Sequence, residues 1–154
     1  MQTTNTTGRL SRTYCQTLRG TRERVFPLLC PEREKEWLPG WDAQMLYSDS
    51  GVAEPGAVFR TQADGVEVIW LVAEHRAPDR VHLVRWHRDA MVVDMELDLS
   101  SRQPGMTTLD IRYTYTATSP VGRAQIEAMS PDQWQAQMQR WQNCLNEWLA
   151  QHPL

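Results

Sequence analysis

Histidine and cysteine are the residues of this chain best suited to bind a metal or act as nucleophiles, but their spacing assembles no site. His82 and His87 are five positions apart, so on an extended strand they point to opposite faces. His75 falls near an expected turn and His152 near the C-terminus. A zinc site needs several converging ligands. The sequence therefore predicts no metal site, and it offers no motif for a cofactor.

Nucleophilic catalysis has equally little support. A Ser or Cys nucleophile needs a base and an orienting acid close by, and we find no such motif. Cys30 follows an expected short helix and precedes Pro31, where a buried thiol is the usual explanation. Gly51 and Gly56 bracket Ala-Glu-Pro in a strand connection, which is not a phosphate-binding loop. We therefore predict no catalytic residue.

The C-terminal segment has the clearest structural pattern. Ser130 can cap a helix, Pro131 suits its first position, and Gln133 completes a capping box. Large apolar residues then recur at steps of four, three, four and three, which places them on one helical stripe. These residues are Trp134, Met138, Trp141, Leu145 and Trp148. The pattern predicts a long helix from about Asp132 to Gln151.

The rest of the chain reads mainly as strands. Residues 9–18 have the composition of a first strand, and 21–29 and 31–37 each predict a short helix. Between Trp41 and Thr118 the pattern is that of strands. Residues 91–99 and 107–116 alternate apolar and polar side chains, as half-buried antiparallel strands do.

Turn lengths then set the expected register. A two-residue loop at Asp89-Ala90 would place Val84 opposite Met95 and Trp86 opposite Val93. With Pro78-Asp79 inside the preceding turn, Leu71 would lie opposite Trp86. This register puts His82 on the apolar inner face and His87 on the outer one. It also puts three charged residues opposite one another on the polar outer face: Arg85, Asp94 and Arg112. These are best explained as a cross-strand ladder of charges exposed to solvent.

Composition bounds the class of protein. The 154 residues carry a formal net charge of −3 with no run of like charge, so the basic face that nucleic acid requires is missing. No apolar run approaches the roughly 20 residues of a membrane span. Residues 1–8 read as a disordered tail and 9–154 as a single domain. The three cysteines form no Cys-x-x-Cys pair, and we expect a reduced, cytoplasmic protein.

One stretch resembles a known group of proteins. The segment 30–41, Cys-Pro-Glu-Arg-Glu-Lys-Glu-Trp-Leu-Pro-Gly-Trp, is similar to a helix-to-strand connection of the START / Bet v 1-like (SRPBCC) superfamily. Tyr47, Ser48, Gly51, Gly56 and Phe59 extend the likeness. That superfamily includes polyketide cyclases, lipid carriers and Hsp90-activator-like domains. The resemblance implies an α+β helix-grip fold, in which a curved antiparallel sheet of six to seven strands wraps a long C-terminal helix, with two short helices after the first strand.

The resemblance also implies a hydrophobic cavity between sheet and helix. Combined with the expected register, it predicts these ligand-binding residues: Trp41, Met45, Tyr47, Arg60, Leu71, His82, Trp86, Met95, Tyr113, Trp134, Met138 and Trp141. For each single residue of the helical stripe, plain core packing is the alternative. Arg60 faces inward only if the Asp64-Gly65 turn excludes Ala63, since otherwise Phe59 turns inward instead.

Two classes of function remain. The first is a carrier or sensor that binds an apolar or aromatic small molecule without chemistry. The second is an enzyme of the polyketide cyclase or dehydratase kind that uses the same cavity. A co-chaperone acting through the outer surface is the weaker third reading. Few polar groups are expected in the cavity, which favours binding. Whether the chain forms a homodimer is left open by the sequence.

Overall fold

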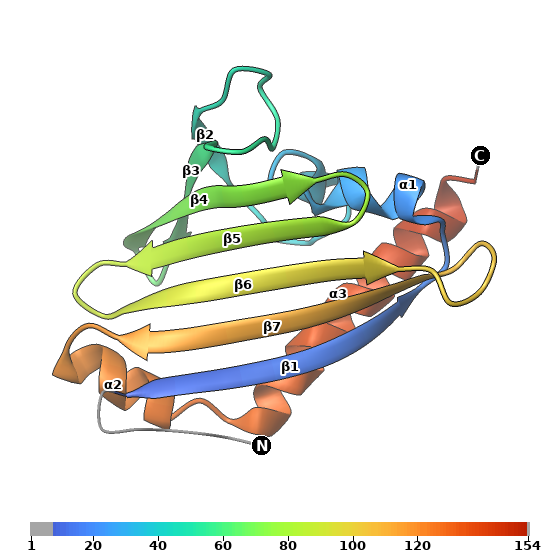
Figure 1. Cartoon of the computed structure of the whole chain (residues 1–154). Helices are drawn as coiled ribbons and strands as arrows, with labels where there is room; N and C mark the ends of the chain where they lie inside the picture. The colour runs from blue at the N-terminus through green and yellow to red at the C-terminus, as the bar shows by residue number, and fades with distance from the viewer. Residues whose placement is uncertain (1–7, 154) are drawn as a thin grey trace.

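A computed structural model describes residues 8–153. Seven antiparallel strands form one curved sheet in the order β1-β7-β6-β5-β4-β3-β2, and the helices lie on its concave side (Figure 1). The strands are β1 (Arg9–Leu18), β2 (Gln44–Tyr47), β3 (Val58–Ala63), β4 (Val66–Arg76), β5 (Arg80–His87), β6 (Met91–Ser100) and β7 (Thr107–Ala117). The helices are α1 (Arg22–Val25), α2 (Pro120–Glu127) and α3 (Pro131–Gln151), with 3₁₀ turns η1 (Phe26–Leu29) and η2 (Arg33–Glu36).

This architecture confirms the predicted helix-grip fold, with seven strands and short helices after the first one. The predicted tail, residues 1–8, lies outside the described residues except for Gly8. None of the helices within 8–153 is long and apolar enough to cross a membrane.

Helix α3 begins where its capping residues predict. The Ser130 hydroxyl accepts a hydrogen bond from the backbone N–H of Gln133, and Pro131 occupies the first turn. The stripe buries Trp134 and Met138 beneath the sheet. The expected helix from Asp132 to Gln151 is confirmed to within one residue.

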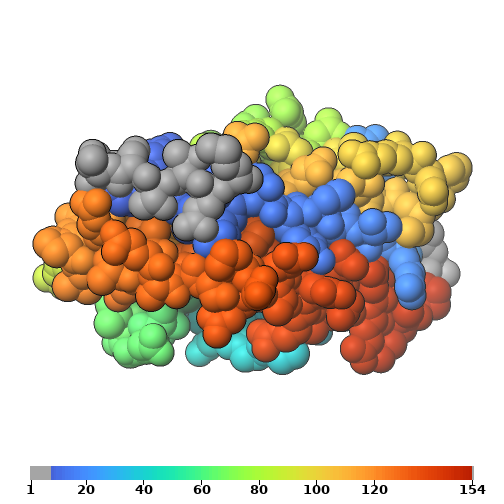
Figure 2. Space-filling view, turned by 90° about the horizontal axis from the view of Figure 1, so that it is seen from below, coloured from blue at the N-terminus to red at the C-terminus, as the bar shows by residue number. Residues whose placement is uncertain are grey.

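Helix α3 also covers the free edge of the sheet. The backbone N–H of Thr17 donates to the side chain of Gln142 at 3.2 Å, and that of Arg19 donates to Asn146 at 2.8 Å. The Asn146 side chain donates back to the Thr17 carbonyl at 3.1 Å. These bonds satisfy backbone groups of the edge strand that would otherwise be open to pairing with another chain. Figure 2 shows α2 and α3 beside β1 on this face.

The β5–β6 hairpin corrects the predicted register. Its loop has three residues, 88–90, and the middle one, Asp89, has a φ of +57°. Aspartate is one of the few residues that tolerate this left-handed conformation in a turn. Val84 therefore pairs with Asp94, and Met95 pairs with Leu83. The expected pairs of Val84 with Met95 and Trp86 with Val93 are wrong, because one extra loop residue reverses the faces of one strand relative to the next.

The β4–β5 pairing is also shifted, but by two residues. Leu71 pairs with Val84 and Ile69 with Trp86, instead of Leu71 with Trp86. A shift of two leaves the faces unchanged, so Leu71 and Trp86 still share one side of the sheet. That side is the outer one, because the β6 face that carries Met95 points to the core.

Helix α2 was not predicted. Ser119 caps it by accepting from the N–H of Gly122, and the N–H of Thr118 just before it donates to the Ala90 carbonyl at 2.8 Å. The helix thereby packs on the β5–β6 loop. This contact requires glycine at position 122, because a Cβ built there would collide with the carbonyl oxygen of Ala90.

Replacing Gly122 with Ala should therefore destabilise the protein. Helix propensity alone predicts a gain of about 1 kcal/mol for this change, whereas overpacking against a backbone atom predicts a loss of about 1–3 kcal/mol. Urea unfolding monitored by circular dichroism gives the sign directly. Gln125→Ala on the exposed side of the same helix serves as the control and should be near neutral. A stabilised Gly122→Ala variant would contradict the close packing.

Candidate functional site

A cavity of about 590 Å³ lies between the sheet, helix α3 and the segment that follows η1. Its rim is formed by exposed residues near positions 40, 62 and 140, and Figure 2 shows the segment around residue 40 (cyan) next to α3. The lining residues are Gln16, Leu29, Glu34, Trp37, Leu38, Pro39, Gly40, Trp41, Asp42, Phe59, Thr61, Gln62, Ala63, Val68, Trp70, Leu83, Arg85, His87, Met95, Leu97, Leu109, Ile111, Tyr113, Gln137, Arg140, Trp141 and Leu145.

Aromatic rings form much of the cavity wall. Trp41 stands edge-on to Trp70 with centroids 5.6 Å apart, and Phe59 stacks on Trp70 at 5.1 Å. The indole N–H of Trp41 donates to the Pro31 carbonyl at 2.8 Å, and that of Trp70 donates to the Thr61 hydroxyl at 2.9 Å. Because both indole donors are already bonded, these two tryptophans can offer a ligand their apolar surfaces without leaving a buried N–H unsatisfied.

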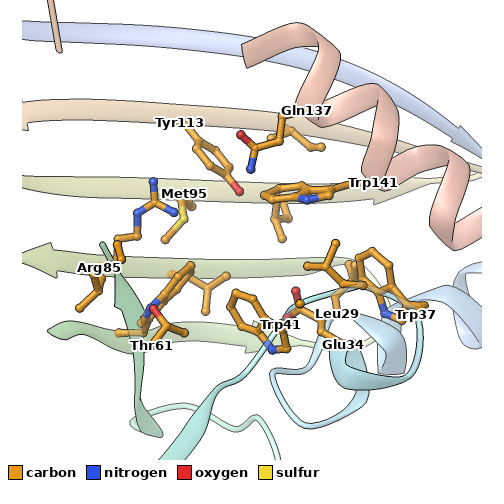
Figure 3. A pocket seen from close by; sticks show the side chains of 18 of the residues that line it. Leu29, Glu34, Trp37, Trp41, Thr61, Arg85, Met95, Tyr113, Gln137 and Trp141 are labelled. Atoms are coloured by element: carbon orange, nitrogen blue, oxygen red, sulfur yellow. The ribbon is translucent and has the colours of Figure 1, made fainter. Parts of the chain in front are cut away.

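Glu34 is an acidic group of the cavity wall. It lies on η2, and its side chain points toward the cavity near Trp41 (Figure 3). Burial raises the pKa of its carboxyl from 4.5 to about 8. The side chain is therefore mostly protonated at neutral pH and can donate a hydrogen bond or a proton to a bound molecule.

Arg85 is the basic group on another part of the wall. Its guanidinium carbon lies 5.2 Å from the ring centre of Trp70 and 5.7 Å from that of Tyr113. Such cation–π contacts offset part of the cost of removing the charge from water. Figure 3 shows Arg85 beside Met95 and away from Glu34.

Two further titratable groups adjoin Arg85. Burial raises the pKa of Tyr113 above its ordinary value, and the positive charge of Arg85 opposes part of that rise. Burial, and to a lesser extent the positive charge of Arg85, lower the pKa of His87 to about 4. Both groups are therefore neutral at pH 7, which leaves Arg85 as the charged group at this wall.

The structure brings together four of the residues expected at the site. Trp41, Met95, Tyr113 and Trp141 all line the cavity. Trp134 and Met138 are buried in the core but are not among the lining residues. The indole of Trp134 donates to the Tyr115 hydroxyl at 2.8 Å, as a residue with a packing role would.

Three expected wall residues point away from the cavity, so their predicted inward position is wrong. Leu71 and Trp86 are 42% and 46% exposed on the outer face. His82 lies on that face too, with its Nε2 2.9 Å from a carboxylate oxygen of Asp94. The cause is the third residue in the β5–β6 loop, which turns the odd-numbered positions of β5 inward. Arg85 and His87, expected outside, face the cavity for the same reason.

The remaining three lie on strands β2 and β3, outside the cavity. Tyr47 is 57% exposed, and its hydroxyl donates to Asp49. Arg60 forms an ion pair with Glu67 at 2.7 Å, because Phe59 is the residue that turns inward. Met45 is partly buried beside Arg60 in a separate shallow groove. The Asp64-Gly65 turn does exclude Ala63. The β4 residue that pairs with Arg60 nevertheless lies on the outer face of the sheet, so Arg60 points outward too.

Glu34 and Arg85 are the functional candidates that sequence reasoning missed. Arg85 was assigned to the outer ladder, and a three-residue loop with Asp89 in the left-handed conformation would have placed it correctly. Glu34 sits in a run of alternating charges that looks solvated. The irregular η1–η2 backbone carries no periodicity from which its direction could be predicted. Within residues 8–153, no three His, Cys, Asp or Glu side chains cluster as a metal site requires.

Replacing Glu34 with Gln should remove a pH-dependent loss of stability. Its pKa is about 8 in the folded protein, against an ordinary 4.5. Between these values the folded state binds more protons than the unfolded state, so the free energy of unfolding of the wild type should fall as pH rises from about 4.5 to 8. Urea titrations at pH 5 and pH 8 measure this fall. Glu34→Gln should show a smaller fall, and the exposed control Glu23→Gln should behave as the wild type. Equal slopes for all three proteins would refute the buried carboxyl.

Comparison with known proteins shows likeness in structure alone. No protein-family model matches the chain, and no curated protein matches its sequence. Ara h 8.0201 has 12% identity and a TM-score of 0.68 over 94% of this chain and 100% of that chain. Protein jhp0584 from Helicobacter pylori has 14% identity and a TM-score of 0.68 over 90% and 85%.

A third match is DynU16, a protein in the dynemicin biosynthetic locus. It has 15% identity and a TM-score of 0.63 over 91% of this chain, which spans about half (47%) of DynU16. At these low sequence identities the structural similarity is evidence for the fold alone. With the observed strand order and the long C-terminal helix, it shows that the chain has the helix-grip fold, as the resemblance to the START / Bet v 1-like (SRPBCC) superfamily implied.

Proposed function

We propose that this protein binds an apolar or aromatic small molecule in the cavity between its sheet and helix α3, as a carrier or sensor. The observation that carries the proposal is the lining itself. A space of about 590 Å³ is walled by aromatic and aliphatic side chains, with a few polar groups at separate points. Ligand pockets commonly have volumes of roughly 300–1,000 Å³ and this mixture of side chains.

Shape and desolvation would supply most of the affinity. Each CH₂ group that a ligand buries contributes about 0.8 kcal/mol, and flat rings can pack edge-on or offset against Trp41 and Trp141. Glu34 and Arg85 would then orient the ligand by hydrogen bonding. This division of roles is that of a binding site for an amphipathic aromatic molecule.

An enzyme of the polyketide cyclase or dehydratase kind is the second candidate, and Glu34 is the observation that favours it. A carboxyl with a pKa of about 8 holds a proton near neutral pH and can transfer it to or from a bound substrate. Tyr113 lies on the cavity wall as a second hydrogen-bond donor. The likeness to DynU16, which comes from a biosynthetic locus, agrees with this candidate at the level of fold.

The neutral fluorescent probe N-phenyl-1-naphthylamine tests the binding proposal. We expect saturable, one-to-one uptake with a rise in probe emission and quenching of tryptophan emission, because Trp41, Trp70 and Trp141 line the cavity. Leu97→Trp adds bulk to a half-buried position of the lining and should weaken uptake at least about tenfold. Fluorescence titration measures both effects, and circular dichroism verifies the fold.

Leu71→Trp is the matched control, since it adds the same side chain to the outer face of the sheet. It should bind the probe as the wild type does. If the wild type takes up no probe, or if both Trp variants lose uptake equally, the cavity is not the binding site.

Glu34→Gln separates the two candidates. A carrier should keep its probe affinity within about threefold in this variant, since the amide fills the same space and still donates a hydrogen bond. An enzyme should turn over a polyketide-like substrate in the wild type and lose that turnover in the variant while probe binding persists. Product formation followed by chromatography decides between them.

A further inference from the structure

Among residues 8–153, Arg85 has no counter-ion. It is half-buried, and among the described residues no carboxylate oxygen lies within 4 Å of its guanidinium. Its close neighbours are instead the rings of Trp70 and Tyr113. Arg80, which is also partly buried, is by contrast paired with carboxylates: it binds Glu74 at 2.8 Å and Glu96 at 3.0 Å. A charge withdrawn from water without an opposite charge nearby is costly. A ligand with a negative charge would offset this cost at Arg85.

Two buried nitrogens point to the same place. Within residues 8–153, neither the Nε atom of Arg85 nor the Nε2 atom of His87 has a hydrogen-bond partner. The two residues are two positions apart on β5, so their side chains leave the same face of the strand. Both also line the cavity. Three other buried side-chain atoms within residues 8–153 are unsatisfied as well, but these two nitrogens lie on one strand face at the cavity, where a ligand acceptor can complete their bonding.

The remaining groups of the wall leave this place electropositive. Glu34 lies elsewhere on the wall, beside Trp41 (Figure 3), and its carboxyl is mostly protonated at neutral pH. Asp42 lies at the exposed rim. Neutral Tyr113 and His87 add no charge, so Arg85 sets the sign of the local potential.

We propose that Arg85 and His87 form a subsite for the carboxylate of an aromatic acid, and that the natural ligand of the cavity belongs to this class. The proposal rests on the binding function proposed above and deepens it. A carboxylate can accept from Nε and one terminal nitrogen of Arg85 side by side, which is the strong bidentate geometry, while the Nε2–H tautomer of His87 donates to either oxygen. The aromatic body of the ligand then extends toward Trp41 and Trp141.

The experiment compares 2-naphthoic acid with 2-naphthamide by isothermal titration calorimetry at pH 7. The two molecules have nearly the same shape, and only the acid is charged. For the wild type we expect the acid to bind at least about tenfold more tightly than the amide, as a charge-assisted pair predicts. In Arg85→Gln the two affinities should become equal within about threefold, chiefly because the acid binds more weakly. Arg85→Lys keeps the charge but loses the bidentate geometry, and it should fall between the two.

Arg140→Gln is the control, because Arg140 is an exposed arginine at the rim of the same cavity. It should keep the preference for the acid. Equal binding of acid and amide by the wild type would overturn the subsite while leaving cavity binding intact, and this comparison requires no variant to fold. A preference lost in Arg140→Gln but kept in Arg85→Gln would overturn it as well. If neither molecule nor the neutral probe binds, the binding function and the subsite fail together.

Discussion

The position of helix α3 along the edge of the sheet determines most of the remaining structure. The helix is held to β1 by hydrogen bonds from Thr17 and Arg19 to Gln142 and Asn146, and by the Gln16 amide, which donates to the Met138 carbonyl at 2.8 Å. One helix is about 10 Å wide, whereas the seven strands at about 4.8 Å spacing span far more. The helix therefore covers the β1 side, and the concave face beneath β3–β5 must be closed in another way.

The segment after β1 provides that closure. The α1–η1–η2 turns bring Trp37 and Trp41 under the far strands, each fixed by an indole N–H bonded to a backbone carbonyl. Irregular backbone and large rings close the space without the dense interdigitation of a helix packed on a sheet, and a cavity is left between Trp41 and Trp141. The cavity follows from covering a wide sheet with one helix and an irregular segment.

The polar groups of the cavity are kept apart, and this separation gives them different chemical states. A carboxylate close to Arg85 would pair with it and have a lowered pKa. Glu34 has no such partner in the part of the chain that the structure describes, so burial dominates and the carboxyl is mostly protonated at neutral pH. Arg85 in turn has aromatic neighbours. A cavity with a neutral donor at one point and a cation at another favours ligands whose ends differ in polarity.

The sequence by itself determined most of the elements, with helix α2 as the exception. The capping residues and apolar stripe located α3, alternation located β6 and β7, and their order with the segment 30–41 indicated the helix-grip fold, because these signals are local. The faces of the strands were decided by tertiary structure. The β5–β6 loop, with Asp89 in the left-handed conformation, is one residue longer than expected. Arg85 and His87 therefore face the cavity, and His82 faces outward. Glu34 depends on an irregular turn whose direction is set by the packing of Trp37 and Trp41. Periodicity fixes spacing along a strand, but only the turn and the packing across strands decide which side faces in.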